Sequence, residues 1–305
     1  MTRILAVELR RFAWRRSFRY FGLIAIAGIL FAATMVFFNS QRGAAASQQA
    51  VVTHQGYIDD CVRGFPRREQ PPEGYSSVEE FCTEVGAPPL ESLDPSFRIT
   101  SLTDIFQGTS VPLIILGLAF GASFIGAEWH HGTITPQLTW DPRRVMVYVG
   151  KALAAMIAVI LAALAIQAIL GIALWVVAMT RGSTEGADLA WFRETLGSAS
   201  RGALIAGLAA ALGFAIASVA RNTATALVIG FVYFGVAESL MRGLRPGWQP
   251  WLVGDNAAAF VTGDPGQVFM AGDIRTAATA LAVVIAYAVV AVGLGAAWFR
   301  SRDVT

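Results

Sequence analysis

Charged residues are scarce in this chain of 305 residues: they make up 14% of it, whereas hydrophobic residues make up 55%. Soluble domains carry roughly 25% charged residues, so this composition excludes an ordinary soluble domain and indicates a membrane protein. Lysine is almost absent, because Lys151 stands alone beside 22 arginines. This usage, with abundant alanine and glycine, indicates a bacterial source of high genomic GC content, such as an actinobacterium.

The common catalytic and nucleotide-binding motifs are also missing. The chain contains no GxxxxGK[ST], HExxH, paired CxxC or GxSxG pattern, so we expect no nucleotide site and no enzymatic activity in this chain by itself. Glu128, His130 and His131 could be imagined as metal ligands, but adjacent histidines on a helix face about 100° apart, and a charged rim is favoured. We expect no metal site. The basic and aromatic residues cluster only beside predicted spans, so nucleic acid is not indicated.

What the chain has in abundance is long apolar runs. At ~1.5 Å per residue, each run is long enough to cross a hydrocarbon core of ~30 Å. We therefore predict an all-α integral membrane protein with a single six-span domain over residues 1–305. The predicted spans are 21–38, 111–127, 145–179, 203–220, 223–240 and 276–299.

Basic residues favour one orientation of these spans. Arginines crowd the segment 1–19, and Arg143, Arg144 and Lys151 flank the third run. Short loops rich in Lys and Arg stay inside, so we expect both termini in the cytoplasm and the protein in the cytoplasmic membrane. The third run is too long for one span, so Lys151 is expected at the cytoplasmic interface.

The N-terminal segment 1–19 spaces Leu5, Leu9 and Phe12 as a helix would. It is therefore either an interfacial helix or a basic tail that sets the topology. A secretory signal is the alternative reading of the first run. Because signal cores span only about 7–15 residues, we predict an uncleaved first span.

Residues 39–108 form a predicted extracytoplasmic loop that is polar and rich in proline. Ser76 and Ser77 each precede a glutamate by three residues, which is a capping-box signal for a short helix that should end at Gly86. Cys61 and Cys82 lie in this loop, and such a pair predicts a disulfide.

The segments 181–201 and 241–275 are the other predicted external pieces. Glu238 lies near the outer face, and Arg242 is placed to form an ion pair with it on one helix; proton coupling is the alternative role for Glu238. Arg221 and Asn222 separate two spans and predict a tight inner hairpin.

Gln167 is a polar residue in the middle of the third run, where it needs a hydrogen-bonding partner. It either lines a transport path or joins two helices.

The segment 128–144 is a polar, basic interruption between the second and third runs. Its signals describe a short helix after Thr133 or Thr135 that stops near Trp140, because Asp141 precedes a proline. Such a helix on the cytoplasmic face is suited to dock a soluble partner. An ordinary basic connector is the alternative.

Several residues here carry a resemblance. In order, Gly126-Ala127-Glu128, Gly132-Thr133, Thr139, Pro142-Arg143-Arg144 and Lys151 resemble the motif after the second span of bacterial ABC type-2 transporter permeases. One departure is His131, where that family usually has arginine. A weaker likeness lies in Trp251-Leu252 and Asn256-Ala257-Ala258.

The resemblance implies a permease subunit that works with two ATPase subunits and a second permease, either an identical copy or a paralogue. ATP and Mg would bind the ATPase subunits, and the cargo of an exporter would be lipophilic or amphipathic. It also implies an elbow helix at 1–19 and a re-entrant segment at 241–275. The residues implied in coupling are Glu128, Gly132, Thr133, Arg143 and Arg144.

Two other function classes stay open. The loop 39–108 could serve a membrane receptor or a membrane-embedded enzyme. A secondary transporter would need carboxylates inside the membrane, for which Glu238 is the nearest candidate.

Overall fold

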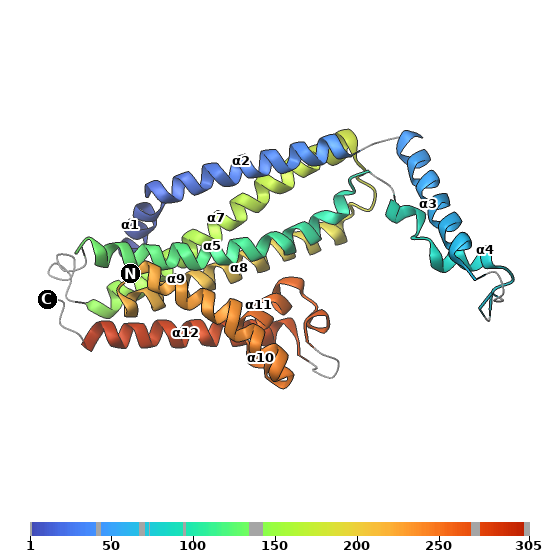
Figure 1. Cartoon of the computed structure of the whole chain (residues 1–305). Coiled ribbons are helices and arrows are strands. Elements are labelled where there is room, and N and C mark those ends of the chain that lie inside the picture. Colours follow the sequence, from blue (N-terminus) through green and yellow to red (C-terminus); the bar gives the residue numbers. More distant parts are fainter. Residues whose placement is uncertain are drawn as a thin grey trace. The chain divides into compact units, whose positions relative to one another are not determined.

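The computed structural model describes residues 2–40, 44–66, 71–72, 74–93, 96–133, 143–269 and 275–301. Within these ranges the chain is helical and contains no β-strand beyond one isolated bridge (Figure 1). The elements in chain order are α1 (Thr2–Ala13), α2 (Arg16–Asn39), α3 (Ala44–Gly64), α4 (Val78–Phe81), the π-helix η1 (Cys82–Gly86), the 3-10 helices η2 (Leu90–Leu93) and η3 (Ile99–Ser101), α5 (Leu102–His130), α7 (Arg144–Arg181), α8 (Leu189–Ala220), α9 (Thr223–Phe231), the π-helix η4 (Val232–Ala237), α10 (Glu238–Leu244), the 3-10 helix η5 (Pro246–Trp251), α11 (Val253–Thr262), the 3-10 helix η6 (Pro265–Gln267) and α12 (Ala277–Ser301).

Six helical stretches in the described residues are long and apolar enough to cross a membrane, as the hydropathy pattern predicts. The protein is therefore a multi-pass, all-α membrane protein. The six candidate spans are Phe18–Asn39, Ile99–His130, Arg144–Arg181, Leu189–Ala220, Thr223–Leu244 and Ala277–Ser301.

The chain divides into two compact units. The first comprises Met1–Ala27, Thr103–Ile169 and Asp188–Thr305, and the second comprises Gly28–Leu102 and Leu170–Ala187. Helices α2 and α7 contribute to both units.

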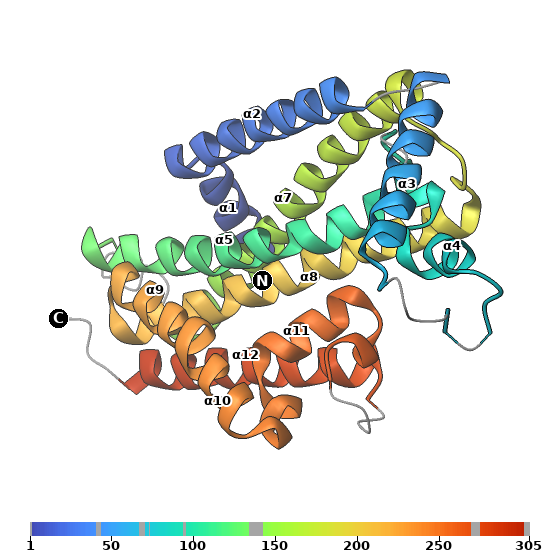
Figure 2. The same ribbon diagram turned by 45° about the vertical axis from the view of Figure 1, so that its right-hand side comes forward.

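In the first unit, α8 is the central helix, and α9, α11 and α12 pack against it (Figure 2). Its sequence is rich in alanine and glycine, and most of its side chains are buried. Small residues allow helix backbones to approach closely, which drives association in a lipid environment. The apolar side chains of α9 are mostly exposed, as expected for a helix that faces hydrocarbon.

Helices α5 and α8 approach each other closely in this unit. A methyl group on Gly117 or Gly121 would lie 2.3 and 1.9 Å from the carbonyl oxygens of Ala206 and Ala210, respectively. On α8, Gly213 approaches the backbone of α5 in the same way. The small-residue pattern at 117–121 therefore serves a contact within the chain.

The second unit is built around a disulfide between Cys61 in α3 and Cys82 in η1, which confirms the predicted pair. Ile58 and Ala87 pack beside it. Before α4, Ser77 accepts a hydrogen bond from the Glu80 amide, and the Glu80 side chain accepts one from the Ser76 amide. Of the two predicted caps, the one between Ser77 and Glu80 is therefore present, and its return bond comes from Ser76.

A second set of hydrogen bonds in this unit ties the end of α2 to the end of α7. Ser40 Oγ donates to the Arg181 carbonyl at 2.8 Å and accepts from the Phe97 amide at 2.9 Å. The Arg181 guanidinium lies 4.7 Å from the centre of the Phe37 ring. These contacts satisfy backbone groups where the two helices end.

Two predictions about the connections were wrong. Most of the predicted loop 181–201 is helical, because Asp188 accepts a hydrogen bond from the Trp191 amide at 2.7 Å and starts α8 at Leu189. The predicted partner of Glu238 was also wrong: Arg242 pairs with Asp255, at 2.5 Å.

The polar segment after α2 contains α3, a helix that hydropathy did not indicate.

Candidate functional site

The only lysine of the chain is buried at the junction of α1, α5 and α7. Lys151 is 3% exposed, and its Nζ atom donates to Glu8 Oε1 at 3.0 Å and to Glu128 Oε1 at 2.9 Å. Both glutamates are buried as well. The structure thus places Lys151 in a buried ion cluster. Its position at the cytoplasmic interface stays a prediction.

Two arginines add positive charge around these carboxylates. Arg15 donates to the carbonyls of Ser123 and Phe124, at 3.1 and 3.0 Å, and its guanidinium lies 4.6 Å from the centre of the Phe124 ring. Burial lowers the pKa of Arg15, while the nearby Glu128 and Glu8 oppose this effect. Arg11, which is exposed, lies 3.6 Å from Glu8. A buried charge without a partner costs free energy, so separating these helices would leave Lys151 or a glutamate unpaired. The contacts therefore hold α1, α5 and α7 in one arrangement.

The local sequence of α1 explains how Glu8 reaches the cluster. Leu5, Glu8, Leu9 and Phe12 follow the three- and four-residue spacing of one helix face. Phe12 is 1% exposed and packs against Phe18 and Phe124. Its burial turns Glu8 toward α5 and α7.

Helix α5 ends at His130, two residues after Glu128, in a Schellman motif. The Thr133 amide donates to the Glu128 carbonyl at 3.1 Å, and the Gly132 amide donates to the Trp129 carbonyl at 3.3 Å. Gly132 has a φ of +65°, which glycine adopts without strain. The chain therefore leaves α5 at a defined point, within about one turn of Glu128.

Trp129 connects this end of α5 to the hairpin between α8 and α9. The Arg221 guanidinium lies 4.5 Å from the centre of the Trp129 ring, within the range of a cation–π contact. Arg221 has a left-handed backbone, with a φ of 53°, and Asn222 then caps α9 by accepting from the Ala224 amide at 2.7 Å. The predicted tight hairpin is thus present, and its arginine has a specific partner.

A comparison with models of known protein families finds no match, and a comparison with curated proteins finds no match either. The site is therefore interpreted from its own geometry.

The residues singled out for coupling have different surroundings. Glu128 is buried in the ion cluster, so it cannot touch a soluble partner directly in this arrangement. Gly132, Thr133 and Arg143 are exposed, and Arg144 is partly exposed. The predicted short helix lies almost wholly in residues 134–142, which are outside the described residues. The structure brings Glu128 together with Glu8 and Lys151, a relationship that the sequence analysis missed.

Gln167 of α7 is 1% exposed, and its side chain lies near Gly202 of α8 and Ser110 of α5. Neither its Oε1 nor its Nε2 has a hydrogen-bond partner among the described residues. Its Nε2 lies 3.4 Å from the position of a methyl group on Gly202, and the Ser110 hydroxyl occupies the same region. A role for Gln167 in a transport path stays a prediction.

The described residues contain no group of three or more His, Cys, Asp or Glu side chains that could hold a metal ion. His130 and His131 lie edge to face, with ring centres 5.2 Å apart. The charged groups Glu8, Glu128 and Lys151 are engaged in ion pairs. The arrangement is thus suited to joining helices mechanically.

Proposed function

We propose that this protein is the membrane-spanning permease subunit of an ABC transporter. The proposal rests on the resemblance of residues 126–151 to bacterial ABC type-2 permeases and on one structural observation. That observation is the Lys151 cluster, which joins α1 to α5 and α7, the two helices that precede and follow the segment 131–143.

This cluster supports a coupling mechanism in physical terms. A force applied to the segment 131–143 acts first on the ends of α5 and α7. Because Lys151 bonds carboxylates from α1 and α5, those helices and α7 would move together. Packed helices that share a buried ion pair shift together and do not deform continuously. A small displacement at the ends of α5 and α7 would therefore be transmitted along the spans. Glu128 would then contribute to coupling through Lys151.

The remaining parts of the assembly belong to the same proposal. Two ATPase subunits would bind ATP and Mg and press on the segment that contains Gly132, Thr133, Arg143 and Arg144. A second permease, identical or paralogous, would complete the path. A lipophilic or amphipathic cargo agrees with the low polarity of the spans, and export is the proposed direction.

The decisive experiment reverses charge at Arg143 and Arg144. The tagged chain is purified from its native membrane, and co-purifying ATPase activity is measured with and without vanadate. We expect vanadate-sensitive activity with the wild-type chain and its loss with R143E/R144E. The control variant is R245E, since Arg245 is exposed in another part of the chain. The absence of ATPase activity from the wild-type preparation would contradict the proposal.

A proton-coupled carrier is the second candidate, because Glu238 is 2% exposed within a candidate span. Its carboxylate accepts from the Gly254 amide at 2.9 Å, at the start of α11. Buried carboxylates in membrane helices commonly mark proton pathways. The variant E238Q keeps an acceptor for that amide but cannot exchange a proton. Dependence of uptake in vesicles on a pH gradient, lost in E238Q, would favour this second function.

A further inference from the structure

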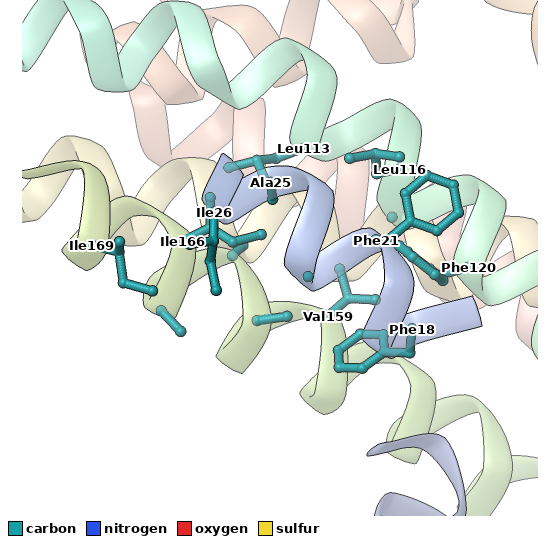
Figure 3. Close-up of a pocket in the computed structure, with 15 residues that line it drawn as sticks. Phe18, Phe21, Ala25, Ile26, Leu113, Leu116, Phe120, Val159, Ile166 and Ile169 are labelled. Atoms are coloured by element: carbon teal, nitrogen blue, oxygen red, sulfur yellow. The ribbon is translucent and has the colours of Figure 1, made fainter. Parts of the chain in front are cut away.

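A half-open cavity of about 220 Å³ lies in the first unit, between the N-terminal part of α2, the middle of α5 and the middle of α7 (Figure 3). All 15 residues that line it are apolar. A cavity without polar groups gives water no hydrogen-bond partners, so it suits a hydrocarbon occupant. The cavity does not include Gln167, whose neighbours Ile166 and Ile169 line it instead.

The two ends of the cavity differ. At one end Phe18, Phe21 and Phe120 pack edge to face, with Phe120 5.4 Å from Phe18 and 5.1 Å from Phe21 between ring centres. At the other end the lining is aliphatic and includes Ile26 and Ile169. Along α2 the lining runs from Phe18 to Ile26, which is about 12 Å of helix at ~1.5 Å per residue. The cavity is therefore elongated along the spans.

Gly22 lines the cavity on the α2 side and contributes no side chain to it. A methyl group on Gly22 would meet no atom within 4 Å, so this position opens into free space. On the facing helix Gly117 also lines the cavity, but its backbone is needed for the contact with α8. A larger side chain at position 22 thus has room to extend from α2, whereas one at position 117 would collide with the backbone of α8.

Positive charge marks the aromatic end. Arg16 and Arg19 flank Phe18 at the start of α2, and both are exposed. Helix α2 contains no acidic residue to balance them. Arginines at the end of a span attract anionic lipid headgroups, and their stems lie along apolar surface.

We propose that this cavity holds one acyl chain of an anionic phospholipid, with its phosphate at Arg16 and Arg19. The chain lies along α2 toward Ile26, and the three phenylalanines surround its first methylenes. The site is a property of this chain alone and does not depend on the proposed transport function.

The test uses phosphatidylglycerol that carries a diazirine in one acyl chain. The full-length protein is reconstituted with this lipid and irradiated, and the labelled residues are mapped by mass spectrometry. We expect labels to concentrate on the cavity-lining parts of α2, α5 and α7. Phosphatidylcholine with the same chain should label these positions several-fold less. Equal labelling by both lipids would overturn the anionic assignment, and even labelling over all exposed span residues would overturn the site.

The variants G22L and G28L form a matched pair on one helix. Neither glycine has an atom within 4 Å of its methyl position, but only Gly22 lines the cavity. Displacing about two methylenes weakens binding by roughly tenfold, so G22L should lose cavity labelling by that factor while G28L keeps it. Thermal unfolding of both variants checks that the fold is retained. Unchanged labelling in a folded G22L would overturn the proposal.

A third variant, R16Q/R19Q, tests the headgroup contact. Phosphatidylglycerol labelling should fall to the phosphatidylcholine level, and phosphatidylcholine labelling should not change. If irradiation instead links two copies of the protein through α2, and the lipid label is absent, a second copy occupies the cavity and the proposal fails.

Discussion

The Nζ atom of Lys151 lies 2.9 Å from Oε1 of Glu128, across the interface between α7 and α5. Glu8 of α1 completes the contact at 3.0 Å, so one ammonium group joins three helices inside the protein. Breaking such a pair leaves an uncompensated buried charge, which is far more costly than the pair's net contribution to stability.

Replacing the lysine should therefore be severe. K151M removes the only cation that bonds both buried carboxylates, and we expect a loss of about 3–5 kcal/mol in the free energy of unfolding. Thermal unfolding in detergent, followed by tryptophan fluorescence, measures the effect. The matched control is the triple variant E8Q/E128Q/K151M, which removes all three charges and should recover most of the loss. An unchanged midpoint in K151M would show that the cluster does not hold the helices together.

The end of α5 supplies a second prediction. G132A places a methyl group on a residue with a left-handed backbone, so we expect destabilisation by about 1 kcal/mol. G108A is its counterpart on the same helix, where the methyl group meets no neighbour within 4 Å. That substitution should stabilise by about 0.5–1 kcal/mol, because alanine is the better helix former. Equal shifts of the unfolding midpoint in both variants would contradict the Schellman assignment.

The disulfide should stabilise the second unit. Cys61 and Cys82 are 21 residues apart, and closing a loop of this size contributes about 3 kcal/mol in the chain-entropy model. The double variant C61S/C82S should thus become sensitive to proteases between α3 and η1, while the helices of the first unit resist digestion. Equal cleavage rates with and without the disulfide would show that the unit is held by its other contacts.

Acid should loosen the capping box before α4. Hydrogen bonds from Ser76 lower the pKa of Glu80. The charged carboxylate therefore stabilises the folded cap above the ordinary glutamate pKa, and this contribution disappears as the pH falls through the lowered value. Hydrogen exchange at the Ser76 amide should show protection that decreases over this acidic range. E79Q should keep the same profile, and E80Q should lose the pH dependence.

The local parts of this fold were readable from the sequence because they depend on neighbouring residues. The six apolar runs match the candidate spans in number and order. The cap at Ser77 and the hairpin at Arg221 and Asn222 each follow from a few adjacent residues. Hydropathy does not reveal α3, because its surface is polar. It does not reveal the start of α8 either, because a single capping residue, Asp188, sets that start.

The candidate site depended on contacts between distant segments. A single lysine within an apolar run, and Glu8 as the only acidic residue before Asp59, were signals that buried charges needed partners. These signals did not show that Lys151 and Glu8 pair with each other and with Glu128. Arg242 shows the same limit, since the pattern predicted a pair along one helix and Asp255 of α11 supplies it instead.

The sequence by itself determined that this is a six-span helical membrane protein, through its hydropathy and its capping residues. The pair Cys61 and Cys82 determined that its polar segment carries a disulfide. Only tertiary structure decided that Lys151 joins Glu8 and Glu128, that Gly121 serves a contact with α8, and that an apolar cavity lies beside α2. The physical reason is distance: a cap or a span is stabilised within a few turns of chain, whereas an ion pair across 143 residues depends on how the helices pack.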